Sequence, residues 1–174
     1  MASGTFGVQV VTPERTLLSG AAVSVVLRTS TGWLTVLDGH TPLIGAVVPC
    51  EIRVEQEDAS VVHLAVHGGF VEVDTSPGAA EGLAEGDGPL AGLSTKVTLL
   101  VGIAELAEEV DAERAERAKE EAEARLSELR GAHRGAQSAE PEAAGQREDL
   151  EILAAQEALE RAELRLGVAR ATTA

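Results

Sequence analysis

Short runs of β-branched and other hydrophobic residues, each bounded by Gly, Pro, Asp or Ser, follow one another along the first hundred positions. Within residues 23–28, hydrophobic and polar positions partly alternate, which is typical of a strand with one better-buried face. The predicted strands are Phe6–Val11, Val23–Arg28, Trp33–Leu37, Glu51–Glu55, Val61–Val66, Phe70–Val73 and Val97–Val101. Many short strands at close spacing favour an antiparallel β-sandwich or flattened barrel over a βαβ sheet.

One stretch interrupts this pattern. Residues 74–95 contain two prolines and five glycines and almost no β-branched residue. We expect a flexible surface loop between two strands, with a partner-binding loop as the functional alternative.

After Val101 the composition changes to Ala, Glu, Arg and Leu. Ala104–Arg130 lacks proline and glycine and predicts one helix, and Asp149–Arg170 predicts a second. Residues 131–148 contain three glycines and Pro141 and predict a loose connection. The expected fold is therefore α+β, with a β-sandwich over 1–102 and an antiparallel two-helix hairpin over 103–174.

The two predicted helices share a narrow, alanine-rich seam. In the second helix, hydrophobic positions recur at alternating spacings of three and four, which is a heptad pattern. The seam positions are Ile152, Ala155, Leu159, Ala162, Leu166 and Ala169, facing Ala115, Ala118, Ala122, Leu126 and Leu129 of the first helix. Because each alanine buries little surface, the hairpin is either a movable element or a static one packed on the sheet.

Charge narrows the range of partners. The 174 residues include 29 acidic and 14 basic side chains, a formal net charge of −15, and aromatic residues make up only 2%. Nucleic-acid binding relies on basic side chains and often on stacking aromatics, so DNA and RNA are not expected partners.

Cys50 is the only cysteine, which excludes an intrachain disulfide, and Met1–Val11 does not resemble a signal peptide. No apolar run reaches the roughly 20 residues of a membrane-spanning helix, so we expect a soluble chain that meets a membrane only through a partner.

No pattern of catalytic or metal-binding residues stands out. His63 and His67 lie in strand-like sequence, where four residues span about 13 Å, too far for both to bind one metal ion. The chain contains neither a G-x-S-x-G nor a G-x-x-x-x-G-K-[ST] motif, and no histidine is near Cys50 in sequence. We therefore predict no catalytic residue, no metal site and no enzymatic activity.

Four segments of the chain carry short motifs. They are residues 6–15 (FGVQVVTPER), 37–44 (LDGHTPLI) with a G-H-x-P-L turn, 64–73 (LAVHGGFVEV) with Gly68 and Gly69 at a hairpin turn, and 97–105 (VTLLVGIAE). In this order the segments resemble the N-terminal domain of ATP synthase epsilon subunits, of which the G-H-x-P-L turn is typical. Each motif is short, but their order and spacing, followed by a helical hairpin, are specific. The resemblance covers nearly the whole chain apart from the two loops.

The resemblance implies a non-catalytic subunit in the central stalk of a bacterial F1Fo ATP synthase. The sandwich would bind the gamma subunit and touch the ring of c subunits, helping to couple proton flow to rotation. The helices would reach the alpha/beta hexamer and restrain ATP hydrolysis. The subunit would be peripheral, at the cytoplasmic face of the plasma membrane.

The c-ring contact departs from the family pattern. Where relatives commonly have an acidic Gly-Glu-Leu/Phe-Gly turn, this chain has residues 30–35 (STGWLT), and Asp38 replaces a common proline. The resemblance assigns the contact to Thr31, Trp33 and His40. Trp33 is either an exposed anchor for a partner or a core residue.

The resemblance also implies a nucleotide site. Residues 110–115 (VDAERA) are similar to the I/L-D-x-x-R-A motif of members that bind ATP, and residues 158–169 (ALERAELRLGVA) to their arginine-bearing stretch. ATP, as a regulatory ligand and not a required cofactor, would be oriented by acidic residues and held through its phosphates by arginines. The predicted site consists of Glu105, Asp111, Arg114, Arg161 and Arg165. Against it, Glu121 stands where nucleotide binders have a further arginine, and Asp111 and Arg114 are also spaced for a simple intrahelical ion pair.

Two rival functions remain at the level of sequence. The same arginines suit a stand-alone ATP-sensing module outside any rotary complex. A small β-barrel enzyme would need histidines and carboxylates that converge, which the sequence does not reveal.

Overall fold

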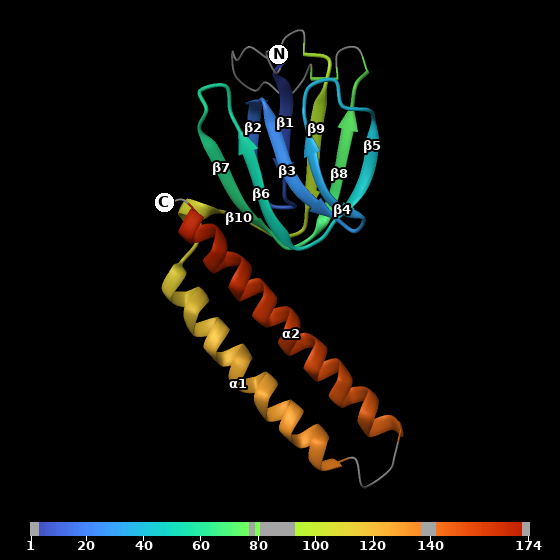
Figure 1. The fold of residues 1–174 in the computed structure, drawn as a ribbon, viewed down its shortest axis with the longest axis vertical. Helices are drawn as coiled ribbons and strands as arrows, with labels where there is room; N and C mark the ends of the chain where they lie inside the picture. Colours follow the sequence, from blue (N-terminus) through green and yellow to red (C-terminus); the bar gives the residue numbers. More distant parts are fainter. Residues whose placement is uncertain (1–3, 77–78, 81–92, 137–141, 172–174) are drawn as a thin grey trace.

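A computed structural model of the chain describes residues 4–76, 79–80, 93–136 and 142–171. It contains a sandwich of short strands with a two-helix hairpin beneath one end (Figure 1). The strands are β1 (Phe6–Val11), β2 (Thr16–Ala22), β3 (Ser24–Thr29), β4 (Gly32–Val36), β5 (Leu43–Val47), β6 (Cys50–Glu55), β7 (Val61–Val66), β8 (Gly69–Asp74), β9 (Lys96–Val101) and β10 (Ala104–Leu106). A 3₁₀ turn, η1 (Ala107–Glu109), leads into helices α1 (Ala112–Ala136) and α2 (Glu142–Ala171).

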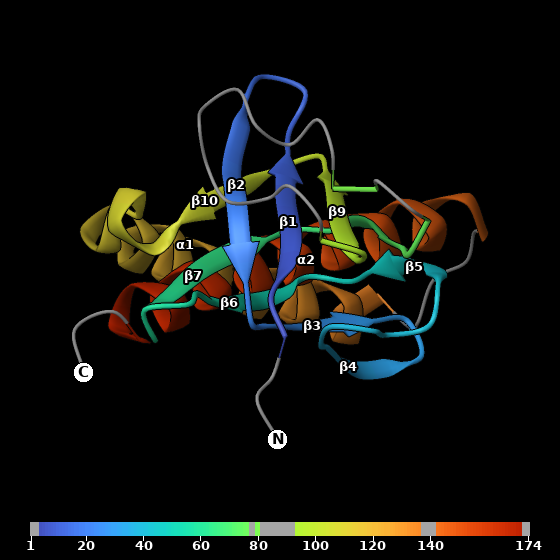
Figure 2. The same ribbon diagram turned by 90° about the horizontal axis from the view of Figure 1, so that it is seen from above.

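The sheet follows the order β10-β7-β6-β3-β5-β8-β9-β1-β2, with β4 paired to β3. Its two ends, β10 and β2, approach each other, so the sandwich is nearly a closed barrel, as the view from above shows (Figure 2). All pairings are antiparallel except that of β1 with β9, which is parallel. The sandwich-then-hairpin fold expected from the sequence is confirmed.

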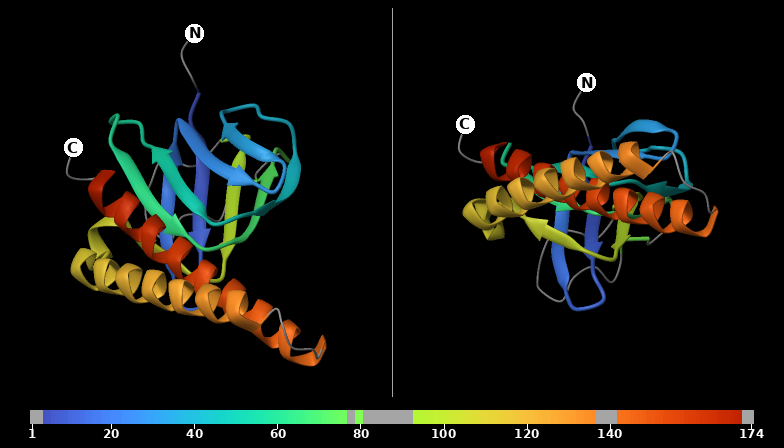
Figure 3. Two further views of the ribbon diagram at one scale, coloured as in Figure 1. Left: turned by 60° about the horizontal axis from the view of Figure 1, so that its bottom comes forward. Right: turned by 90° about the horizontal axis from the view of Figure 1, so that it is seen from below.

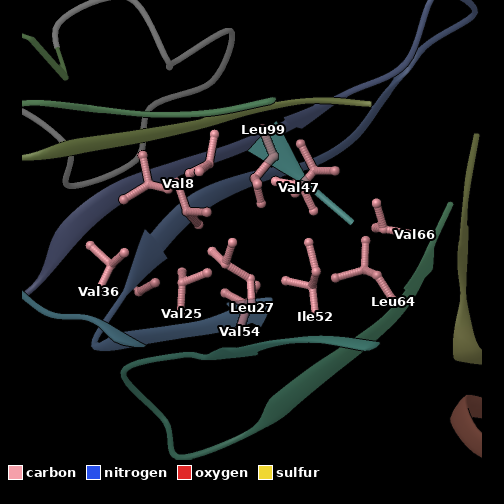
Figure 4. Packing of buried hydrophobic residues seen from close by; sticks show 14 of the residues in the cluster. Val8, Val25, Leu27, Val36, Val47, Ile52, Val54, Leu64, Val66 and Leu99 are labelled. Atoms are coloured by element: carbon pink, nitrogen blue, oxygen red, sulfur yellow. The ribbon is translucent and has the colours of Figure 1, made fainter. Parts of the chain in front are cut away.

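The core is built from the inward-facing residues of the strands, which alternate with outward-facing residues along each strand. In β6, Cys50, Ile52 and Val54 are buried while Arg53 faces solvent. Residues of this kind from opposite layers meet in one cluster, of which Figure 4 labels Val8, Val25, Leu27, Val36, Val47, Ile52, Val54, Leu64, Val66 and Leu99. With few aromatic residues available, β-branched and leucine side chains fill the interior.

The connection between β7 and β8 differs from the expected hairpin. These two strands do not pair, because β7 pairs with β6 and β10 whereas β8 pairs with β5 and β9. The chain crosses from one layer to the other at Gly68 and Gly69, both with positive φ. A Cβ on Gly69 would lie 2.3 Å from the carbonyl oxygen of Leu100, so this position requires glycine.

Three further strands were not predicted, namely β2, β5 and β10. The first helix was expected to begin at Ala104, but Ala104–Leu106 instead pair with Leu64–Val66 as β10, and α1 begins at Ala112. The helices also extend into the predicted connection, as far as Ala136 and back to Glu142. Residues 137–141 and most of the predicted loop 74–95 lie outside the described residues.

The hairpin seam is largely as expected. Ala115, Ala122 and Leu126 of α1 and Ala155, Ala162 and Leu166 of α2 are buried. Ala118, expected in the seam, is exposed. The helices run antiparallel, and α2 is the one that packs on β6 and β7 (Figure 3). Neither helix, over its described residues, is long and apolar enough to cross a membrane.

Candidate nucleotide and partner sites

A cleft of about 290 Å³ opens where the sheet meets the hairpin. It is lined by Glu105, Glu109, Asp111, Arg114, Ala115, Ala118 and Arg165. Four of the five residues predicted to bind ATP therefore lie together, contributed by β10, the start of α1 and the last third of α2. The small side chain of Ala118 helps to leave this space open.

Arg161, the fifth predicted residue, lies one turn before Arg165 on α2. It lines a neighbouring hollow of about 370 Å³ between the two helices, together with Glu121 and Arg125. Arg165 and Ala118 line both spaces, so the cleft and the hollow adjoin. Arg161 lies 3.8 Å from the Glu157 carboxylate on its own helix. The predicted five-residue site is therefore split over two adjoining spaces.

Asp111 has a structural role at the start of α1, separate from its predicted role in ATP binding. Its Oδ1 accepts a hydrogen bond from the backbone N–H of Arg114 at 2.9 Å, which makes Asp111 the N-cap of α1. The observed contact is thus a helix cap, and not the ion pair between side chains that the spacing also allowed. Capping leaves the Arg114 side chain directed to the cleft wall, where it is exposed.

Glu105 and Arg165 join the sheet to the hairpin. The Nε of Arg165 donates to Oε2 of Glu105, and both side chains are about one-third exposed. A second ion pair lies in the same region. Nη2 of Arg15, in the β1–β2 connection, donates to both carboxylate oxygens of Glu109 at 2.6 Å. The Arg15 guanidinium keeps the pKa of Glu109 below its ordinary value. Two of the acidic residues that line the cleft, Glu105 and Glu109, are thus each paired with an arginine.

His67 lies next to Glu105, which lines this cleft. Its side chain is only 5% exposed, and its Nε2 is 3.9 Å from Oε2 of Glu105. Among the residues that the structure describes, neither ring nitrogen has a hydrogen-bond partner. Burial lowers the pKa of His67 below its ordinary value, and the positive charge of Arg165 lowers it further while Glu105 opposes the shift. No sequence pattern indicates this contact, because Ala104–Leu106 were expected to be helical.

The other strand histidine has a different environment. His63, four residues earlier, has its Nδ1 2.6 Å from Oε1 of Glu51 on the neighbouring strand β6. Among the described residues, no group of three or more His, Cys, Asp or Glu side chains converges as a metal site would require.

The residues predicted to contact a c ring lie at two places. Thr31 and Trp33 are at the β3–β4 turn, where they line a hollow of about 330 Å³ together with Ile44 of β5. Trp33 is 66% exposed, so of the two alternatives the core position is wrong. His40 follows β4 at its other end, and its Nδ1 lies 2.8 Å from the carbonyl oxygen of Thr41. Asp38 in the same turn accepts a hydrogen bond from the buried Thr95 hydroxyl at 3.2 Å.

An exposed apolar face lies on the outside of the sandwich. Phe70 of β8 and Leu100 of β9 are register partners, and Phe70 also pairs with Ala46, two residues from Ile44 on β5. Phe70, Leu100 and Ile44 are 59%, 52% and 76% exposed. Because Val71 and Val73 point inward, strand alternation places Phe70 outward, a signal that the sequence already contained. Large exposed apolar side chains grouped on adjacent strands indicate a protein-binding surface.

Comparisons with known proteins agree on one family. Residues 5–77 match the family model for the β-sandwich domain of the ATP synthase delta/epsilon chain. The chain is 37% identical to the ATP synthase epsilon chain of Streptomyces avermitilis over 117 residues, which cover 67% of this chain and 79% of the relative. It is 39% identical to the epsilon chain of Desulforudis audaxviator, over 73% of this chain and 78% of the relative.

Longer matches extend into the helices. The epsilon chain of Thermobifida fusca is 34% identical over 145 residues, covering 76% of this chain and 93% of the relative. A chain in a structure of the Euglena gracilis mitochondrial ATP synthase shares the fold, with a TM-score of 0.62 at 21% identity, over 98% of this chain and 82% of that one. Sequence and fold together show that the chain belongs to the family of ATP synthase epsilon subunits.

Proposed function

We propose that this chain is a non-catalytic central-stalk subunit of a proton-translocating F1Fo ATP synthase, which couples the rotor to F1 and regulates ATP hydrolysis through a mobile C-terminal hairpin. In this role the sandwich binds the gamma subunit and the c ring, and the helices reach the alpha/beta hexamer. The subunit is peripheral, at the cytoplasmic face of a bacterial plasma membrane. Membership of the epsilon family supports the assignment to the complex.

The apolar face supports attachment of the sandwich to another protein subunit. Ile44, Phe70 and Leu100 present adjacent apolar side chains that a partner would remove from water. We assign this face to the gamma subunit. Thr31 and Trp33 remain the proposed c-ring contacts, and a surface that also includes His40 must span the length of β4.

Co-purification of the full chain with the gamma subunit of the same organism tests this attachment. Phe70→Thr keeps a strand-forming residue but removes the exposed ring, so we expect it to weaken complex formation strongly. Val61→Thr, at an exposed position of β7 in the other layer, is the matched control and should bind normally. A wild-type chain that binds ATP but never co-purifies with gamma would favour a stand-alone ATP sensor.

The cleft is the observation on which the regulatory role depends. Its residues come from β10, α1 and α2, so one ligand in the cleft contacts the sheet and both helices at once. We propose that ATP binds there and holds the hairpin in its docked form. Arg114, Arg165 and Arg161 hold the phosphates, and Glu105 and Asp111 orient the ligand. Because Glu105 now engages Arg165, phosphate must compete with this ion pair.

Titration of the full chain with ATP by calorimetry or NMR tests the proposed ligand. Arg114→Ala removes charge-assisted contacts that are worth about 1.5–3 kcal/mol, so we expect binding to weaken roughly 10- to 100-fold. Arg117→Ala is the matched control, because Arg117 is an exposed α1 residue outside the cleft whose carboxylate neighbour is Glu113. If millimolar ATP produces neither heat nor chemical-shift changes, the ligand is not ATP.

A further inference from the structure

His67 is a buried imidazole at the boundary between the sheet and the hairpin. It directly follows β7, and its backbone N–H donates to the carbonyl oxygen of Ile103 at 3.1 Å, just before β10. The side chain is 95% removed from solvent, and within the described part of the chain both ring nitrogens lack a hydrogen-bond partner. Leaving such a polar group unsatisfied is costly, so any state in which a ring nitrogen gains a partner is favoured by that bond.

One carboxylate oxygen serves both His67 and the hairpin. Oε2 of Glu105 accepts the hydrogen bond from Nε of Arg165, and the same oxygen is the nearest acidic atom to Nε2 of His67, at 3.9 Å. A cationic imidazole would need only a small movement to donate to this oxygen. Arg165 therefore now occupies the acceptor that His67 would use.

We infer that anion binding in the cleft is coupled to protonation of His67. When a phosphate group draws Arg165 away from Glu105, Nε2 of His67 takes a proton from water and replaces Arg165 as the partner of Glu105. The carboxylate then keeps a cationic partner, and the buried imidazole gains the hydrogen bond that it lacks. This inference rests on the proposed binding of ATP in the cleft and adds a proton to that reaction.

The electrostatic direction follows from the groups that face His67. These are Glu105 from β10 and Arg161 and Arg165 from α2. In the ligand-free chain, burial and the two arginines lower the pKa of His67, and Glu105 alone raises it. Phosphate offsets the arginine charges and frees Glu105, so the pKa of His67 rises when the ligand binds.

The sign of the pH dependence is fixed by this rise. A group whose pKa is higher in the complex than in the free chain binds a proton when the complex forms. ATP affinity therefore increases as the pH falls from above the His67 pKa of the complex to the His67 pKa of the free chain. Each unit by which the pKa rises is worth a tenfold change in affinity across that interval. His67 thus makes the docked hairpin respond to both nucleotide and proton concentration.

Two measurements on the full chain test the inference directly. NMR titration of the His67 ring should show a higher pKa with saturating ATP than without it. Calorimetry in two buffers of different ionisation enthalpy, at a pH between the two pKa values that the NMR titrations give, should show net proton uptake. An unchanged His67 pKa in the ATP complex, or uptake that persists without His67, overturns the inference while leaving ATP binding itself intact.

Matched variants separate His67 from other titrating groups. The terminal phosphate of a nucleotide itself titrates near neutral pH, with a pKa of about 6 for a phosphate monoester, so its contribution must be subtracted. His67→Gln should abolish the His67-dependent uptake but retain ATP binding at alkaline pH. His63→Gln, four residues earlier in β7, should retain the wild-type uptake because His63 faces Glu51 and not the cleft. A wild-type chain that fails to bind ATP at any pH overturns both this inference and the proposed ligand.

Discussion

The sandwich and the hairpin both bury apolar side chains, but those in the sandwich core are larger than those in the hairpin seam. In the sandwich, Phe6, Leu27, Ile52, Leu64 and Leu99 are wholly removed from solvent and meet residues from both layers. In the hairpin, four of the six buried seam side chains named above are alanine, and Val168 of α2 is buried outside that seam. Since a methylene is worth about 0.8 kcal/mol, the seam holds its helices far less firmly than the core holds its strands.

This difference bears on the proposed mobility of the hairpin. The sandwich presents its apolar face from a fully packed core. The hairpin packs on β6 and β7 through α2, and the ion pair of Glu105 with Arg165 is a polar contact of this attachment that the proposed ligand would exchange. A movable element requires that its attachment be weaker than its own internal structure and that a ligand can alter it. The predictions below test that contrast.

The largest effect is expected from a cavity in the sandwich. Ile52→Ala removes a wholly buried side chain from the centre of the core and should lower the free energy of unfolding by about 2–5 kcal/mol. Chemical denaturation followed by circular dichroism measures this change. Val61→Ala, at an exposed strand position, is the control and should change stability by no more than about 0.5 kcal/mol. Equal effects at the two sites would contradict the packing described here.

The crossing between the two layers should be nearly as sensitive. Gly69→Ala places a Cβ against the Leu100 carbonyl oxygen and forces a non-glycine residue to a φ of +153°, which should cost at least about 1–3 kcal/mol of unfolding free energy. Gly20→Ala in β2 is the matched control, because a Cβ there meets nothing within 4 Å. Thermal unfolding of both variants provides the comparison.

The sandwich was predictable wherever strands are rich in valine, and less so elsewhere. Phe6–Val11 and Val61–Val66 match β1 and β7 residue for residue. By contrast, β2 ends in Ser-Gly-Ala-Ala and β5 contains a central glycine, so neither has the β-branched composition that marks a strand. Ala104–Leu106 reads as helix by propensity, but pairing with β7 outweighs that preference.

The candidate site was predictable where a local motif determines the geometry. Asp111 caps the start of α1 and so places Arg114, and Arg165 lines the same cleft because the heptad seam sets how the helices face. Pairings between distant segments have no such local signal. The contact of His67 with Glu105 depends on β10 joining β7, and the tie between Arg15 and Glu109 joins residues 94 positions apart.

Overpacking the seam should loosen the hairpin without affecting the sandwich. Ala162 is 1% exposed between α1 and α2, so Ala162→Leu should destabilise the helical pair by about 1–3 kcal/mol. Ala154→Leu, at an exposed α2 position, should have little effect. Hydrogen exchange measured segment by segment should show faster exchange in α1 and α2 while β6 and β8 remain protected. Faster exchange throughout the sheet would mean that the two parts unfold as one unit.

The smallest effect is expected at the start of α1, where capping and ligand binding meet in one residue. Asp111→Ala removes the acceptor for the Arg114 N–H and should cost about 0.5–2 kcal/mol of helix stability. Asp111→Asn retains a capping oxygen, so helix stability measured by circular dichroism should stay close to wild type. If the carboxylate also orients ATP, Asp111→Asn should weaken nucleotide binding even though the cap is kept. Normal ATP binding by Asp111→Asn, together with weak binding by Asp111→Ala, would instead show that Asp111 serves the site only by forming the helix that carries Arg114.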